Sequence, residues 1–201
     1  VAHFTLDDNA NDSSGHGYHG TVMGAPTYVA GVEGQAILLG GNGDYVDFGT
    51  PAGWPSGLAP RTMTAWGRTR SIAAGWRWIA SYGTGAASQA MFIGLNGADL
   101  YGGGHGDDVM VPGFWDIDEW HHVGLTYDGV TARLYADGIE VASAPKQWNL
   151  VPDRAHIGRQ VSDQIEFWTG SVDEVRIYDR ALSPGEIAWL AGRRSPVHES
   201  F

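Results

Sequence analysis

Two neighbouring carboxylates, Asp173 and Glu174, lie in the segment GSVDEVRIYDRAL at residues 170–182. The segment is typical of a β-strand, and side chains on a strand alternate between its two faces. Alternation places Asp173 on the face of Val175, and Glu174 on the opposite face with Arg176. A carboxylate among core residues costs several kcal/mol unless a cation or dense hydrogen bonding compensates it. We therefore expect Asp173 to be compensated in this way, and Glu174 to form a surface pair with Arg176.

A second oxygen-rich segment, LDDNANDSSGHGYHG, lies at residues 6–20. It supplies aspartate and asparagine side chains, and glycines that leave backbone carbonyls accessible, which is the hard-oxygen chemistry that calcium prefers. Two interpretations are open. Either calcium is bound here, or Asp12 caps a turn while Asp173 pairs with Arg154 or Arg159.

Carboxylates in two loops are candidates for catalytic residues. Asp107 and Asp108 follow a glycine-rich stretch, and Asp116 and Asp118 lie in WDIDEW. A solvated hairpin and an ordinary turn are the simpler interpretations of these loops. The chain has neither a Gly-x-Ser-x-Gly nucleophile elbow nor a phosphate-binding loop.

The adjacent histidines His121 and His122 point to opposite faces of their strand, so they cannot bind one ion together. His121 shares its face with Val123 and Leu125, which indicates a hydrogen-bonded core histidine. His122 lies on the surface or in a groove.

Aromatic residues are the other candidates for a binding site, because sugar rings stack their C–H faces on indole. The chain has nine tryptophans. Trp66 and Trp120 fall in strand-like stretches, where we expect them to be buried, and six others lie in or beside loops. The residues that we expect to line a carbohydrate-binding groove are Trp78, Tyr82, His105, Asp107, Trp115 and Trp148.

Composition limits the classes of function. The 201 residues carry a formal charge of 12 − 23 = −11, which disfavours nucleic acid and anionic membrane surfaces. No apolar run approaches the roughly 20 residues that span a bilayer. The chain has no cysteine, which excludes disulfides, thiol catalysis and thiolate zinc sites.

The pattern of turns predicts an antiparallel meander folded into two packed sheets. Turn dipeptides separate apolar runs at Asn42-Gly43, Asn96-Gly97, Asp128-Gly129 and Asp137-Gly138. Only SPGEIAWLAG predicts a helix, with Ser183 and Glu186 as a capping box and Gly192 at its end. We expect one domain over residues 1–192, with residues 193–201 as a tail or linker remnant.

Three stretches, AHFTLDDNANDSSGHGYHGTV, EWHHVGLTYDGVTARLYADGIEV and FWTGSVDEVRIYDRALSPGEIAWLAG, together resemble the LamG-like jelly-roll domains of the concanavalin A-like lectin/glucanase superfamily. The resemblance implies an all-β, two-sheet antiparallel sandwich with one short C-terminal helix. It also implies a structural calcium ion that joins the first loop to the last strand. Its ligands would be the side chains of Asp12 and Asp173 and the backbone carbonyl of His19.

The Glu-x-Asp-x-x-Glu strand that the glucanases of this superfamily share is missing from this chain. We therefore expect a non-catalytic, calcium-stabilised carbohydrate-binding or adhesion module, not an enzyme. Its partners would be a polysaccharide or glycan and the other domains of a secreted, extracellular protein, which the resemblance suggests is a glycan-active enzyme. The alternatives are a divergent glycoside hydrolase or polysaccharide lyase, and a structural or protein-binding domain.

Overall fold

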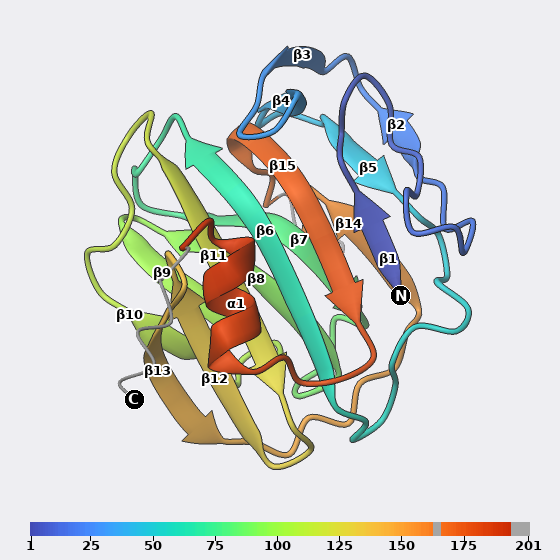
Figure 1. Cartoon of the computed structure of the whole chain (residues 1–201), viewed down its shortest axis with the longest axis vertical. Coiled ribbons are helices and arrows are strands. Elements are labelled where there is room, and N and C mark those ends of the chain that lie inside the picture. The colour runs from blue at the N-terminus through green and yellow to red at the C-terminus, as the bar shows by residue number, and fades with distance from the viewer. Residues whose placement is uncertain (163–165, 194–201) are drawn as a thin grey trace, which may run out of the picture.

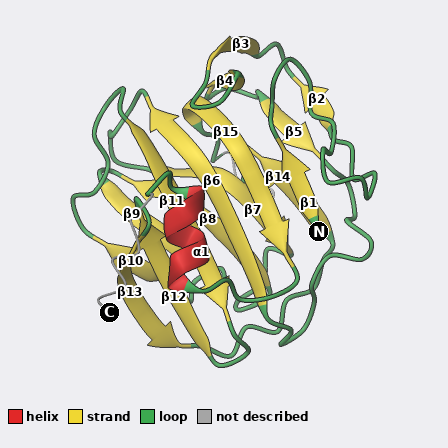
Figure 2. Ribbon diagram, in the orientation of Figure 1, coloured by secondary structure: helices red, strands yellow, loops and turns green. Residues whose placement is uncertain are grey.

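The computed structural model describes residues 1–162 and 166–193. In this part of the chain, two antiparallel sheets pack face to face, and a short helix covers the outer face of one of them (Figure 1). Figure 2 shows that strands make up both layers and that loops join them at the ends. The predicted two-sheet antiparallel sandwich is confirmed.

Sheet A is the layer that carries the helix. Its strands are, in spatial order, β13 (Ile139–Pro145), β12 (Thr131–Ala136), β11 (Trp120–Tyr127), β6 (Arg61–Thr69), β15 (Thr169–Tyr178), β4 (Gln35–Gly40) and β3 (Thr27–Ala30), with β1 (Ala2–Phe4) also paired to β15. Sheet B is the second layer. Its strands are, in spatial order, β10 (Val109–Val111), β9 (Asp99–Gly103), β8 (Ala90–Asn96), β7 (Trp76–Gly83), β14 (Arg154–Ile157), β5 (Tyr45–Asp47) and β2 (Thr21–Met23).

The core lies between the sheets and is made by alternate residues of their strands. In β11, Val123, Leu125 and Tyr127 are fully buried among apolar side chains. The neighbouring strand β6 contributes Met63 and Ala65 to the same core. The residues between these positions therefore point to the outer face of sheet A.

Three of the four predicted turns join paired strands. Asn96-Gly97 lies between β8 and β9, Asp128-Gly129 between β11 and β12, and Asp137-Gly138 between β12 and β13. The prediction of a hairpin at Asn42-Gly43 is wrong, because β4 belongs to sheet A and β5 to sheet B. A turn dipeptide gives the change of chain direction but does not say whether the flanking strands pair.

A β-bulge interrupts β15 at the carboxylate pair. Asp173 lies opposite Trp66 of β6, and Arg176 lies opposite Thr64, so two residues of β15 face a single residue of β6. Glu174 has a φ of 51°, in the left-handed region. Directly opposed residues share a face, so Asp173 points to the outer face with Trp66. The prediction that Asp173 faces the core is wrong, because the bulge shifts the alternation by one residue.

The predicted helix is present as α1 (Pro184–Leu190). Ser183 and Glu186 form the expected capping box at its start. Ile187 is fully buried and fixes the helix to sheet A, while Trp189 is left 66% exposed. The helix therefore carries a large aromatic ring at the protein surface.

Residues 194–201, which make up most of the predicted tail, lie outside the described residues. The domain assignment 1–192 stays a prediction. The one helix among the described residues is too short to cross a membrane.

Candidate functional site

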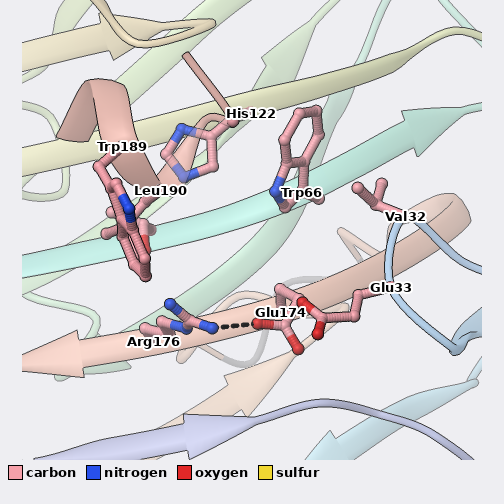
Figure 3. A pocket seen from close by; sticks show the side chains of 10 residues that line it. Val32, Glu33, Trp66, His122, Glu174, Arg176, Trp189 and Leu190 are labelled. Carbon is pink, nitrogen blue, oxygen red and sulfur yellow. Dashed lines mark hydrogen bonds and ion pairs between the residues drawn. The ribbon is translucent and has the colours of Figure 1, made fainter. Parts of the chain in front are cut away.

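A pocket of about 370 Å³ lies on the outer face of sheet A beside α1 (Figure 3). Strands β6, β11 and β15 form its floor, and the turn between β3 and β4 and the end of α1 border it. Its lining residues are Val32, Glu33, Thr64, Trp66, His122, Glu174, Arg176, Trp189, Leu190 and Gly192. Segments far apart in the sequence therefore meet in one pocket.

Two tryptophans provide flat apolar surfaces in this pocket. Trp66 points outward from β6 opposite His122 of β11, and the two rings meet edge to face with centroids 5.3 Å apart. Trp189 extends from α1 toward the same space. Figure 3 shows the two indoles on either side of His122. The space between them suits a ligand with a flat apolar face.

Three buried polar atoms of the pocket have no hydrogen-bond partner among the described residues. They are Thr64 Oγ1, His122 Nδ1 and Arg176 Nε. Burial lowers the pKa of His122 to about 4, so its ring is neutral at pH 7 and can either donate or accept. Buried polar atoms nearly always have a partner, so a bound molecule or a water that reached these atoms would satisfy them.

An ion-pair cluster forms one border of the pocket. Glu174 Oε2 accepts a hydrogen bond from Arg176 Nη2 and lies 2.9 Å from Nε2 of His3, which β1 places opposite Arg176. Burial alone would raise the pKa of Glu174, but the hydrogen bond from His3 and the charge of Arg176 lower it overall. Glu174 is therefore ionised. The predicted pair with Arg176 is confirmed, although Glu174 is only 8% exposed and not a surface residue.

Asp173 holds the turn that forms another border of the pocket. Its Oδ2 accepts hydrogen bonds from the backbone N–H groups of Val32 (2.8 Å) and Glu33 (3.2 Å). Its side chain is fully buried, and Oδ1 has no partner among the described residues. Burial raises the pKa of Asp173 to about 6 despite the two N–H donors. The described contacts thus make Asp173 a positioning residue for the β3–β4 turn.

The family of the chain follows from its sequence match. The Laminin_G_3 family model, which describes the concanavalin A-like lectin/glucanase superfamily, matches residues 40–188. The chain belongs to this superfamily. The resemblance stated from the sequence is thereby confirmed. No curated protein matches the chain.

Solved structures with a similar fold include a domain of an enzyme and binding domains of toxins. Domain 4 of AbnA, a GH43 extracellular arabinanase from Geobacillus stearothermophilus, in complex with arabinotriose, is 22% identical, with a TM-score of 0.74 over 94% of this chain and 97% of that one. The binding domain of Paraclostridial Mosquitocidal Protein 1 is 18% identical, with a TM-score of 0.69 over 94% of this chain and 51% of that one. The botulinum neurotoxin serotype D ligand-binding domain in complex with N-acetylneuraminic acid is 13% identical, with a TM-score of 0.70 over 96% of this chain and 50% of that one. The chain thus spans about half of each toxin domain, and the likeness at these identities shows the fold.

Of the calcium ligands that the resemblance implied, the side chain of Asp12 is engaged with the chain itself. Both oxygens of Asp12 accept hydrogen bonds, from the backbone N–H groups of His3, Ser14 and Tyr18 and from the Ser14 hydroxyl. Nδ1 of His19 accepts from the Asp12 N–H. Burial opposes the effect, but these hydrogen bonds lower the pKa of Asp12 far below its usual value. This arrangement matches the turn-capping alternative, and Asp12 does not fit a calcium ion unless these donors move.

The alternative partners of Asp173 lie elsewhere. Arg154 Nε lies 3.8 Å from Asp153 Oδ2, and the guanidinium of Arg159 lies over the ring of Tyr45, at 5.0 Å. Asp173 is instead compensated by backbone donors of the β3–β4 turn.

The predicted aromatic groove is corrected by the structure. Trp78, Tyr82, Trp115 and Trp148 are each no more than 2% exposed, so none offers a ring face to a sugar. Trp115 and Trp148 come from loops but fold into the core between the sheets. Large rings from connecting segments fill the space that the strands leave, and a loop position in the sequence therefore did not imply exposure.

The polar members of that groove have structural partners. Asp107 binds Lys146 Nζ at 2.5 Å, and it accepts further hydrogen bonds from Ser88 and from Trp148 Nε1. His105 lies near Phe92 on the outer face of sheet B, away from the pocket on sheet A. The six predicted residues thus do not form one open site.

The carboxylates considered for catalysis near β11 are exposed. Asp118 lies 3.5 Å from Arg68. Asp116 and Glu119 lie close to His121, and in the described part of the chain this is the only group of three such side chains spaced to hold a metal ion. Nδ1 of His121 lies 2.9 Å from Asp137, which agrees with the prediction of a hydrogen-bonded histidine.

Trp66, which we expected in the core, lines the pocket instead. The sequence MTAWGRT contained the signal, because alternation from the buried residues Met63 and Ala65 puts Trp66 on the face of Thr64 and Arg68. The exposure of Trp189 follows similarly from helical spacing. Ile187 takes the buried face of the helix, and a residue two positions later points away from that face.

Proposed function

We propose that this chain is a non-catalytic carbohydrate-binding module and that the pocket on sheet A is its glycan site. The observation that carries the proposal is the presence of two indole rings, from Trp66 and Trp189, beside three buried polar atoms without partners. A sugar ring has a C–H face that stacks on indole and hydroxyl groups at its edge that need hydrogen bonds. The pocket offers both kinds of contact.

The similar structures support this proposal. Domain 4 of the arabinanase was solved with arabinotriose, and the serotype D domain with N-acetylneuraminic acid. The chain also matches almost the full length of domain 4, which is one domain of an extracellular enzyme. We infer that this chain is likewise a module of a secreted, extracellular protein, attached to other domains such as a glycan-active enzyme.

The two carboxylates that β15 contributes at or beneath the pocket, Asp173 and Glu174, favour binding over hydrolysis. Glycoside hydrolysis by two carboxyl groups needs one that is protonated and reaches the glycosidic oxygen. Glu174 has a lowered pKa and is paired with His3 and Arg176. Asp173 has a raised pKa but is fully buried beneath the β3–β4 turn. Neither combines a suitable pKa with access to a ligand.

Glycan binding by the wild type and three alanine variants tests the site. A glycan array identifies a ligand, and calorimetry then compares Trp66→Ala and Trp189→Ala with Trp76→Ala, a control on the outer face of sheet B. Removal of a stacking ring is expected to weaken binding at least about tenfold, as removal of aromatic stacking platforms does elsewhere. Trp76→Ala is expected to bind like the wild type. The absence of any glycan ligand, or loss of binding in Trp76→Ala alone, would contradict the proposal.

A separate measurement tests the proposal that the chain does not hydrolyse its glycan ligands. The glycans that bind are incubated with the wild-type chain, and the release of reducing sugar is followed. We expect none above the background without protein. Release that disappears in Asp116→Asn or Asp118→Asn would establish the hydrolase alternative instead.

Calcium stays a prediction that thermal melting can decide. An ion that binds only the folded chain raises the melting temperature by mass action. Calcium between the first loop and β15 would therefore make EDTA lower the melting temperature of the wild type, with a smaller effect on Asp173→Asn. An unchanged melting temperature in both proteins would contradict the calcium site.

A further inference from the structure

We propose that the pocket on sheet A selects glycan units without acidic groups and that Glu174 is the residue that enforces this selection. The inference rests on the proposed function of the pocket as a glycan site. It goes further because it names the chemical class of sugar that the pocket accepts. It also sets this chain apart from a fold relative that was solved with the acidic sugar N-acetylneuraminic acid.

Among the described residues that line the pocket, Arg176 is the one arginine or lysine, and its charge is already engaged. Its Nη2 donates to Glu174 Oε2, and Figure 3 shows this contact at the edge of the pocket. A guanidinium binds a carboxylate best through two parallel N–H groups, and both such forked edges include an Nη nitrogen. The contact with Glu174 uses one of the two N–H groups of Nη2 and offsets the charge of the guanidinium, so a sugar carboxylate would have to compete with Glu174 for Arg176.

A further donor of Arg176 suits a hydroxyl group. Its Nε is buried and has no partner among the described residues. Thr64 Oγ1 and His122 Nδ1 are likewise free, and a threonine hydroxyl and a neutral imidazole interact with uncharged groups. Single, separate contacts of this kind fit the hydroxyl groups on a sugar ring.

The charges around the pocket disfavour an anion. Two carboxylates, Glu33 and Glu174, line it against one guanidinium. The side chain of Glu174 is only 9% exposed, so its charge is weakly screened by solvent. An acidic sugar would have to give up its hydration beside these carboxylates without gaining a free cation. Such repulsion is a common way to exclude a wrong ligand.

Matched ligands and a charge-removing variant test this inference on the whole chain. Each neutral glycan that binds is compared with a counterpart that carries a uronic acid in place of the neutral unit. We expect the acidic counterpart to bind at least about tenfold more weakly, and this difference to shrink several-fold in Glu174→Gln. The control is Glu119→Gln, which removes the same charge from an exposed site outside the pocket and should leave the ratio unchanged.

A second variant covers the case in which Glu174→Gln does not fold. Glu33 is exposed on the β3–β4 turn, so Glu33→Gln should fold and should shrink the ratio in the same direction. Acidic glycans that bind the wild type as tightly as their neutral counterparts would overturn the inference while leaving the glycan site intact. If the wild type binds acidic glycans more weakly and neither Glu174→Gln nor Glu33→Gln reduces this difference, the role of Glu174 is overturned. A chain that binds no glycan of either class would overturn the proposed function and the inference together.

Discussion

The outer faces of the two sheets both carry tryptophans, but in the described part of the chain the two groups of rings differ in how they are packed. On sheet B, Trp76 and Trp78 stack nearly parallel with centroids 5.3 Å apart, and Trp78 also packs against Phe92. The indole N–H of Trp78 donates to Glu166 at 2.6 Å. On sheet A, Trp66 and Trp189 border a pocket instead of packing into a cluster.

This difference separates an aromatic cluster that stabilises the fold from one that can bind a ligand. In the cluster on sheet B, Trp78 and Phe92 are no more than 2% exposed. The indole N–H of Trp78 is satisfied within the chain, by Glu166. The pocket on sheet A keeps a cavity, and three of its buried polar atoms have no partner among the described residues. An aromatic count from the sequence does not distinguish the two. A cavity between accessible rings does.

The largest expected effect comes from removing one ring in each region. Trp78→Ala should lower the free energy of unfolding by about 3–5 kcal/mol, because it leaves a cavity in a filled cluster. Trp66→Ala should lower it by about 1 kcal/mol, because its ring is half-buried and borders a space that is already open. Urea denaturation of both variants measures the contrast. Equal losses would show that Trp66 is also packed as part of the fold.

The sequence predicted the layers of the fold better than the orientation of the site residues. Turn dipeptides, strand alternation and the capping box at Ser183 follow local rules, so they were visible without a structure. The bulge at Asp173 was not visible, because it depends on how β15 pairs with β6. One extra residue moves Asp173 from the core face to the outer face, where it supports the pocket.

The aromatic residues show the same limit. Trp115 and Trp148 lie in connecting segments, and only the three-dimensional fold shows that they fill the core. Trp66 was predictable from alternation, but the family's core-strand pattern suggested burial instead. Alternation along one strand says which residues share a face. It does not say that a helix from the end of the chain will border that face and make a pocket.

A smaller effect should follow from removing the carboxylate that orders each region. Asp173 holds the N–H groups of Val32 and Glu33, and Glu166 holds the indole N–H of Trp78. Either alanine substitution leaves donors unpaired and should lower the free energy of unfolding by about 1–3 kcal/mol. Only Asp173→Ala should also weaken glycan binding, because it releases a border of the pocket.

Hydrogen exchange locates this effect. In Asp173→Ala, the amides of Val32 and Glu33 should exchange faster than in the wild type, with no such change in Glu166→Ala. Asp12→Ala is a control in the loop between β1 and β2, because Asp12 accepts from amides of other residues, among them Ser14 and Tyr18. Unchanged protection at Val32 and Glu33 would show that Asp173 does not position the turn.

The smallest expected effect is a pH dependence that compares a histidine from each region. Burial lowers the pKa of His122 to about 4, and it also lowers the pKa of His156 on sheet B. An unfolded histidine has a pKa of about 6.5, so between that pH and the folded pKa only the unfolded chain binds the proton. Acidification through this window therefore favours unfolding, and the contribution of each buried neutral ring is lost as the pH falls.

The difference between the two histidines lies in their hydrogen bonds. Nδ1 of His156 lies 3.2 Å from the backbone oxygen of Gln160, whereas Nδ1 of His122 has no partner among the described residues. The free energy of unfolding of the wild type relative to His122→Gln should fall as the pH is lowered from about 6.5 to 4, as urea denaturation across this range would show. In an NMR titration, a bound glycan that contacts Nδ1 should shift the pKa of His122 and leave that of His156 unchanged. Equal shifts at both rings would place the ligand somewhere other than the pocket, because only His122 lines it.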